Sequence, residues 1–181
     1  MKAIPLEVEV EFSNNGITDS LTGAPAPKLF LDNLAREIAK SKRKFQAISI
    51  ITVKVTLGSN QNKVQGKDFS RNSLKNNERG LDAKNRFKGF EKELILVGLT
   101  IRSKIRSGDF YSRFAENGFW VCIQGDIEDA KKTSERFSSS FSSAKESSKE
   151  EVSINFSGIE WDLNMELSDL IRYVDLSYFT S

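Results

Sequence analysis

The sequence predicts an α+β domain in which a central, mostly antiparallel sheet is flanked by helices. Short β-branched and aromatic segments alternate along the chain with segments of helical periodicity, a pattern typical of helices packed on the faces of one sheet. The pair Asn117-Gly118 lies between two apolar runs, which indicates a β-hairpin and therefore antiparallel neighbours. A chain of 181 residues can bury a substantial core as one domain.

The first half of the chain contains three predicted elements. Residues 6–12 alternate between apolar and acidic side chains, which predicts a half-buried strand at the N-terminus. Apolar residues at helical spacing from Phe30 to Ile38 predict a helix that ends in the basic residues 40–44. Residues 47–55 are β-branched or apolar on both faces, and this pattern is typical of a central strand covered on two sides.

The second half contains the hairpin, a further strand and three helices. Apolar spacing places them in this order: a helix from Phe90 to Ile105, strands at 110–114 and 119–123, a helix from Ile127 to about Ser138, a strand at 152–161 and a short helix at 167–174. A Ser- and Lys-rich link is expected between the third helix and the last strand.

Residues 58–88 differ from the rest of the chain in composition. They carry eight basic and three acidic residues and little apolar periodicity, and we interpret them as a surface insertion. A charged, solvated loop is the commoner explanation of such a segment, and contact with an anionic partner is the alternative. The expected division is a strand extension over 1–17 and a single domain over 18–181 that contains this insertion.

Composition excludes several function classes. The chain has no histidine, so His-dependent triads, His metal sites and His proton shuttles are excluded. A net charge of +2 gives no whole-protein field that would attract nucleic acid or an anionic membrane. The one cysteine, Cys122, lies in an apolar run that favours a buried, reduced thiol. We therefore expect a cytoplasmic protein without a membrane partner, and we consider nucleic acid an unlikely one.

Three strings resemble one known family when they are taken together. Residues 19–25 (DSLTGAP) are similar to a D-x-L-T-G-L-P motif that precedes a helix, and residues 169–178 resemble a late E-L-L-x-x-A-D motif. Arg106, Asp109 and Arg113-Phe114 keep the spacing of an R-x-x-D-x-x-x-R-(Y/F) motif that leads into a hairpin. The family is the GGDEF domain of diguanylate cyclases, and the resemblance covers residues 18 to 179. It implies a nucleotidyl-cyclase-like fold.

The departures from this family concern its catalytic residues. In the family, Mg²⁺ and the GTP phosphates are held by an aspartate of the first central strand and by carboxylates of the signature, and here Thr52, Asn117 and Gly118 occupy those places. Magnesium requires charged oxygen ligands, so these replacements remove the catalytic centre. Glu116 lies one position early and would point to the other face of a strand. We therefore expect no enzyme activity, no catalytic residues, no metal and no cofactor.

The R-x-x-D motif is the part of the resemblance that could retain a function. In the family it binds the product, cyclic di-GMP, away from the catalytic pocket, and here it consists of Arg106 and Asp109. An arginine can pair with guanine O6 and N7 or with a phosphate, and a carboxylate accepts from the guanine N1 and N2 hydrogens. Arg136 lies where the family has a second arginine, often from a neighbouring subunit. Arg113 could add positive charge nearby or only cover apolar surface.

The sequence leaves three hypotheses for the function. The first is a catalytically inactive GGDEF-like domain that acts as a cyclic di-GMP receptor through Arg106, Asp109 and Arg136. The second is an interaction module that has lost nucleotide binding and works through a protein partner or as a homodimer. An active diguanylate cyclase is a distant third. The alternative to ligand binding by Arg106 and Asp109 is an exposed ion pair that contributes little to stability. The alternative for Arg136 is a solvated side chain on a helix.

Overall fold

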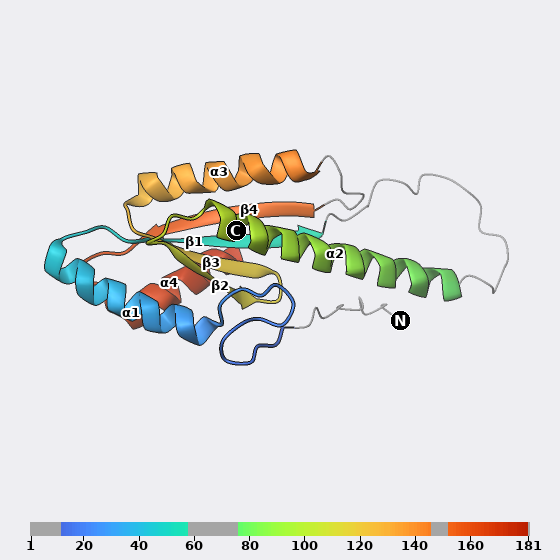
Figure 1. Ribbon diagram of the computed structural model, residues 1–181, viewed down its shortest axis with the longest axis horizontal. Helices are drawn as coiled ribbons and strands as arrows, with labels where there is room; N and C mark the ends of the chain where they lie inside the picture. The colour runs from blue at the N-terminus through green and yellow to red at the C-terminus, as the bar shows by residue number, and fades with distance from the viewer. Residues whose placement is uncertain (1–11, 58–75, 146–151, 181) are drawn as a thin grey trace.

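The protein is an antiparallel four-stranded sheet with two helices on each face (Figure 1). The computed structural model describes residues 12–57, 76–145 and 152–180, the side chains of 76–87, 143–145 and 179–180 excepted. In chain order the elements are α1 (Pro27–Lys44), β1 (Ser49–Leu57), α2 (Asn76–Lys104), β2 (Phe110–Ala115), β3 (Gly118–Ile123), α3 (Ile127–Lys145), β4 (Val152–Glu160) and α4 (Leu167–Thr180). The predicted α+β architecture is confirmed.

The strand order is β2-β3-β1-β4, and β1 lies inside the sheet because it pairs with both β3 and β4. Its alternate residues face two separate cores. Ile51, Val53 and Val55 pack with α2 and α3 on one face. Ile50 packs with α1 and α4 on the other. This two-sided burial explains why most residues of the strand are β-branched, and the place of β1 inside the sheet confirms the prediction of a central strand.

The predicted hairpin is confirmed, although the reason given for its turn is not. Strands β2 and β3 are joined by Glu116 and Asn117, with Ala115 paired to Gly118. Among the described residues only Phe45, Gly16 and Gly23 have a positive φ, so this turn does not use the positive φ that an Asn-Gly pair tolerates. Asn117 is instead held by β1. Its backbone carbonyl accepts from the Val55 N–H at 2.8 Å and its side-chain amide donates to the Val55 carbonyl at 3.0 Å.

The predicted start of the second helix is wrong, because residues 76–88 are helical; that 58–88 is an insertion stays a prediction. Helix α2 begins at Asn76, and Figure 1 shows its first turns extending past the end of the sheet. A helix that runs beyond the sheet has no core to face there, so its sequence needs no apolar stripe. Residues 58–75 lie outside the described residues.

Two helices are longer than the apolar spacing predicted. Helix α3 continues to Lys145, through part of the expected Ser- and Lys-rich link, and α4 continues to Thr180. The predicted N-terminal strand lies outside the described residues except for Phe12, which belongs to no strand. None of the helices in the described ranges is long and apolar enough to cross a membrane. The expected division at residue 17 stays a prediction.

Candidate functional site

The tip of the β2–β3 hairpin is the place where the resemblance puts a catalytic centre. Strand β1 runs beside this tip, and its Lys54 pairs with Gly118 across the β1–β3 ladder. Thr52 lies two residues before Lys54 on β1, on the same face of the sheet but farther from the tip. It pairs with Trp120 and is 1% exposed. The assignment of Thr52 to the family's metal position stays a prediction. The β1 residue at the tip is Lys54, whose cationic side chain is the opposite of a metal-binding carboxylate.

Thr52 has a feature of its own. Its hydroxyl oxygen is buried and has no hydrogen-bond partner among the described residues. An unsatisfied buried hydroxyl costs roughly 1–3 kcal/mol of stability. Because Thr52 lies between Trp120 of β3 and Ser157 of β4 in the ladder, its side chain is enclosed by the sheet and the helices that cover it. It is therefore not available to a ligand.

Tyr178 of α4 covers the hairpin tip. Its hydroxyl hydrogen-bonds to the Asn117 side-chain oxygen at 2.5 Å, and its ring lies so close to Gly118 that any side chain there would overlap it. Lys54 completes the arrangement, because its ammonium donates to the Tyr178 backbone carbonyl at 3.2 Å and lies 5.4 Å from the centre of the ring. Burial, with the nearby Glu116 carboxylate as the second cause, raises the pKa of Tyr178 to about 12. The tip is thus occupied by a neutral tyrosine.

No carboxylate cluster is found at this tip. Across the described parts of the chain, no group of three His, Cys, Asp or Glu residues is arranged to hold a metal ion. Glu116 is exposed and near Tyr178, but it is a single carboxylate. Besides the single Glu116 carboxylate, the residues at the tip offer one ammonium, one amide and one phenol, and this set supplies too few charged oxygen ligands for Mg²⁺.

Arg113 and Asp19 form a buried ion pair that joins the D-x-L-T-G segment to the hairpin. The Arg113 Nη1 donates to both Asp19 carboxylate oxygens, at 3.1 and 3.0 Å, and the two side chains are 0% and 1% exposed. Asp19 also accepts from the Thr22 backbone N–H at 2.7 Å and from the Thr22 hydroxyl at 2.6 Å. Arg113 therefore neither adds charge to a ligand site nor merely covers apolar surface. It fixes the loop before α1 to strand β2.

The R-x-x-D motif forms the turn between α2 and β2. One Asp109 carboxylate oxygen accepts from the Arg106 backbone N–H at 3.0 Å, and the other accepts from the Gln124 backbone N–H at 3.1 Å. Asp109 is 8% exposed, whereas Arg106 is exposed. The side chains of Arg106 and Asp109 do not form an ion pair with each other, since the ion pairs of the described residues do not include them. The alternative of an exposed ion pair is therefore wrong. Asp109 shapes the turn, and the Arg106 guanidinium remains open to solvent.

Arg136 lies on α3 and is not brought into contact with the turn. It is exposed, and its guanidinium donates to the Thr133 hydroxyl one turn earlier at 2.8 Å. Within the described ranges no hydrogen bond or ion pair joins Arg136 to Arg106 or Asp109. A ligand that used all three residues would have to bridge α3 and the turn, or take Arg136 from a second copy.

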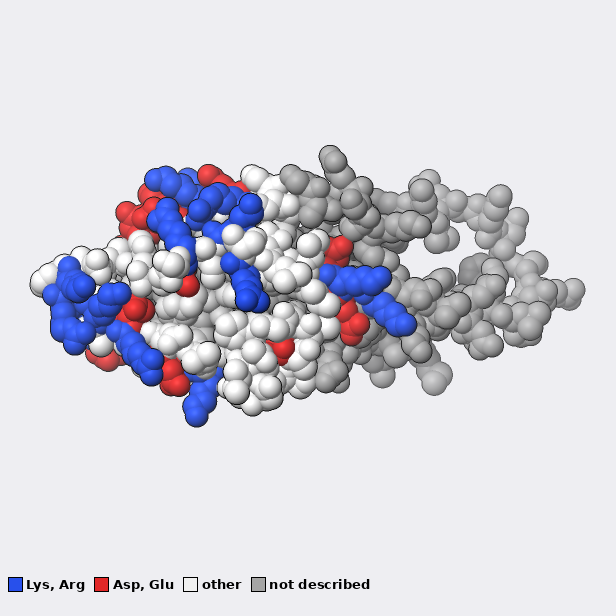
Figure 2. Space-filling model, viewed as in Figure 1, with Lys and Arg blue, Asp and Glu red and all other residues white. Residues whose placement is uncertain are grey.

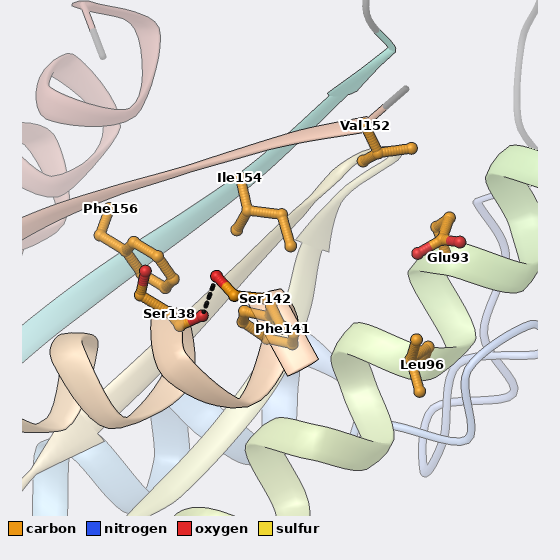
Figure 3. A pocket seen from close by; sticks show the side chains of 8 residues that line it. All are labelled: Glu93, Leu96, Ser138, Phe141, Ser142, Val152, Ile154 and Phe156. Carbon is orange, nitrogen blue, oxygen red and sulfur yellow. Dashed lines mark hydrogen bonds between the residues drawn. The ribbon is translucent and has the colours of Figure 1, made fainter. Parts of the chain in front are cut away.

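An apolar crevice lies between α2, α3 and β4 (Figure 3). Phe141, Ile154 and Phe156 line it, together with the Ser138 and Ser142 side chains, and its volume is about 120 Å³. The Ser142 hydroxyl donates to the Ser138 backbone carbonyl at 3.0 Å. The crevice has few polar groups to orient a nucleotide, so it is not a candidate site for cyclic di-GMP.

A scan against protein-family models finds no match, and a search of curated proteins finds no relative. Solved structures do match. The GGDEF domain of DgcB from Caulobacter crescentus, in complex with c-di-GMP, matches with a TM-score of 0.68 and 13% identity, over 94% of this chain and 92% of that one. The GGDEF domain of YfiN (TpbB) from Pseudomonas aeruginosa matches with a TM-score of 0.66 and 14% identity, over 90% and 87%.

A longer protein has the same fold in part. Diguanylate cyclase SiaD of Pseudomonas aeruginosa, in complex with its activator SiaC, matches with a TM-score of 0.65 and 17% identity. The match covers 90% of this chain and 56% of the SiaD chain, so this chain spans little more than half of that protein. At such identities the likeness establishes the fold. The chain has the GGDEF-domain fold, and the resemblance drawn from its sequence motifs is confirmed at that level.

Proposed function

We propose that this protein is a catalytically inactive GGDEF-like domain that binds cyclic di-GMP through the turn containing Arg106 and Asp109. Arg136 contributes from the same chain or from a second copy in a homodimer. The protein acts as a receptor in the cytoplasm and requires no metal or cofactor. The proposal depends on the contrast between the two ends of the hairpin. Tyr178 covers the tip, whereas Arg106 is exposed in the turn that precedes β2 at the other end.

The inactive part of the proposal follows from the charges at the tip. Phosphoryl transfer depends on Mg²⁺ ions that bridge the phosphates and neutralise the developing charge. Lys54 would repel a divalent cation at this place, and Asn117 offers only a neutral amide that already bonds to Tyr178 and Val55. Tyr178 fills the space beside Gly118. Turnover of GTP by this tip is therefore not expected.

The binding part follows from the hydrogen-bonding capacity of the turn. The Arg106 guanidinium has five donors and can hold a phosphate or the O6 and N7 edge of guanine in a bidentate arrangement. Each Asp109 oxygen is engaged by one backbone N–H and keeps a second lone pair for an additional donor. The DgcB domain named above was solved with c-di-GMP, which agrees with this choice of ligand.

A second candidate function is a protein-interaction module without nucleotide binding. One observation favours it: Tyr173 and Leu176 on α4 are 52% and 53% exposed and line a shallow pocket with Asp169 and Arg172. SiaD, which has the same fold, was solved with a protein activator. Exposed aromatic and arginine side chains are enriched in protein interfaces.

The test is the effect of Arg106→Ala on cyclic di-GMP binding, measured by isothermal titration calorimetry. Loss of a hydrogen bond to a charged group is expected to cost about 1.5–3 kcal/mol of binding free energy. Arg102→Ala, a change to another basic residue near the end of α2, is the matched control and is expected to change binding little. If Arg106→Ala binds as tightly as the parent, or if the parent shows no binding at millimolar ligand, the interaction module replaces this proposal.

A further inference from the structure

A polar pocket lies next to the R-x-x-D turn. Helix α1, the loop after it and the end of β3 form its walls, and its lining residues are Glu37, Ser41, Gln46, Ala47, Gln124 and Gly125. Its volume is about 260 Å³, which is below the roughly 300–1,000 Å³ of pockets that hold whole drug-sized ligands. The pocket therefore suits one planar base and cannot take a complete cyclic dinucleotide.

Gln124 connects this pocket to the turn. Its backbone N–H donates to Asp109 at 3.1 Å, and its side-chain Nε2 donates to the Glu37 carboxylate at 3.0 Å. The same side chain lies against Gly108, inside the turn, where an added Cβ would be 2.6 Å from its oxygen. Both carboxylates contribute to raising the pKa of the buried Cys122 thiol, after the larger effect of burial. Glu37 and Asp109 thus lie on either side of Gln124.

The two carboxylates differ in what they can offer a ligand. Asp109 is 8% exposed and already accepts from two backbone N–H groups. Glu37 lines the pocket with a side chain that is 22% exposed, and its partners are side chains, Lys40 and Gln124, and not backbone N–H groups. Of the two, Glu37 is the carboxylate that an entering base meets first.

The groups of the pocket match guanine better than adenine. A carboxylate accepts from the adjacent N1 and N2 hydrogens of guanine, whereas adenine presents an acceptor at N1 and no amino group at C2. The side-chain amides of Gln46 and Gln124 can donate to guanine O6. Replacing guanine by adenine would leave these groups unpaired, which is the arrangement that gives strong discrimination.

The charges around the pocket suit the phosphates of the same ligand. The last turn of α1 carries Lys42, Arg43 and Lys44, and Figure 2 shows Lys and Arg side chains gathered at the end of the molecule where α1 ends. Arg106 is exposed in the neighbouring turn. Lys40, whose ammonium lies 3.0 Å from the Glu37 carboxylate, is the cation at the pocket itself, and it would attract the phosphate of a ligand whose base enters the pocket.

We propose that Glu37 reads a guanine base of the ligand in this pocket, next to the turn where Arg106 holds the adjoining phosphate or second base. This inference rests on the proposed function and adds a guanine-reading carboxylate on α1 that the motif strings do not contain. Glu37 becomes the specificity-determining residue, and Asp109 the residue that shapes the turn.

The test compares the parent protein with Glu37→Gln, using cyclic di-GMP, cyclic di-AMP and GMP as the titrated ligands. The amide of Gln places a donor against the guanine hydrogens, so affinity for cyclic di-GMP and for GMP is expected to fall by about tenfold or more. The preference for cyclic di-GMP over cyclic di-AMP is expected to shrink as well, an effect that a merely structural role would not produce. Glu93→Gln is the control, and an unchanged thermal midpoint confirms folding. Gln46→Ala is the second variant and should also weaken guanine ligands.

The outcomes separate this inference from the proposed function. If Arg106→Ala weakens cyclic di-GMP while Glu37→Gln and Gln46→Ala bind within about twofold of the parent, the function stands and the guanine pocket is overturned. If the parent does not bind cyclic di-GMP but binds GMP in a manner that Glu37→Gln abolishes, the pocket stands and the proposed function fails. If the parent binds neither ligand at millimolar concentration, both are overturned.

Discussion

Replacing Asp19 by asparagine is expected to destabilise the protein through the charge that it leaves behind. Asn has the shape of Asp and keeps an oxygen for Thr22, so the local turn is retained while the negative charge is lost. The Arg113 guanidinium is 0% exposed and would lose the charge of the Asp19 carboxylate, which lies 3.0 Å from it. Breaking a buried ion pair in this way typically costs about 3–5 kcal/mol of unfolding free energy.

The loss can be measured by urea unfolding followed by tryptophan fluorescence. A change of about 3–5 kcal/mol corresponds to a fall of roughly 6–20 °C in Tm for a chain of this size. The matched control is Glu166→Gln, which breaks the exposed Lys42–Glu166 pair, 43% and 74% exposed, at 3.7 Å. The control is expected to change stability by less than about 1 kcal/mol.

A second variant separates charge from packing. In the double variant Asp19→Asn with Arg113→Met the buried cation is removed too, so part of the lost stability is expected to return. If Asp19→Asn costs no more than the Glu166→Gln control, the argument from buried charge is refuted.

Two further predictions concern the closed hairpin tip. Gly118→Ala is expected to cost about 1–3 kcal/mol of stability because its Cβ overlaps the Tyr178 ring. In a protein that also carries Tyr178→Ala, the same change should cost no stability. An equal cost with and without the Tyr178 ring would contradict the packing. The pKa of Tyr178 is about 12 in the folded protein against a reference of 10.0, so the unfolded state ionises first as pH rises. Stability is therefore expected to fall between pH 10 and 12 by about 1–3 kcal/mol. A Tyr178→Phe protein that declines as steeply as the parent over this range would contradict the assignment.

The elements that the sequence predicted correctly are those whose signal is local. Strand β1 and the helical segments facing a core carry apolar residues at a fixed spacing, and that spacing depends only on neighbouring residues. The first turns of α2 escaped prediction for the same reason. Residues 76–88 lie partly beyond the sheet and have no apolar stripe, so a helix there is indistinguishable by pattern from a charged loop.

The features of the site that sequence reasoning missed depend on residues far apart in the chain. Asp19 and Arg113 are 94 positions apart, and neither carries a local sign of its partner. The place of Lys54 beside the tip follows from the β1–β3 register, which a motif cannot fix. Tyr178 belonged to a matched string, yet its contact with Gly118 arises from the packing of α4 on the sheet. Glu37, which we propose as the guanine-reading residue, belongs to no motif string.

A domain that binds cyclic di-GMP without making it, as we propose, can be tested for both properties in one experiment. The most direct measurement is a side-by-side titration of the purified protein with cyclic di-GMP and GTP, with and without Mg²⁺, followed by chromatography of the GTP samples for product. We expect saturable, Mg²⁺-independent binding of cyclic di-GMP and no product from GTP, because Lys54, Asn117 and Tyr178 occupy the hairpin tip. Magnesium-dependent formation of cyclic di-GMP, or no binding of the dinucleotide at millimolar concentration, would contradict it.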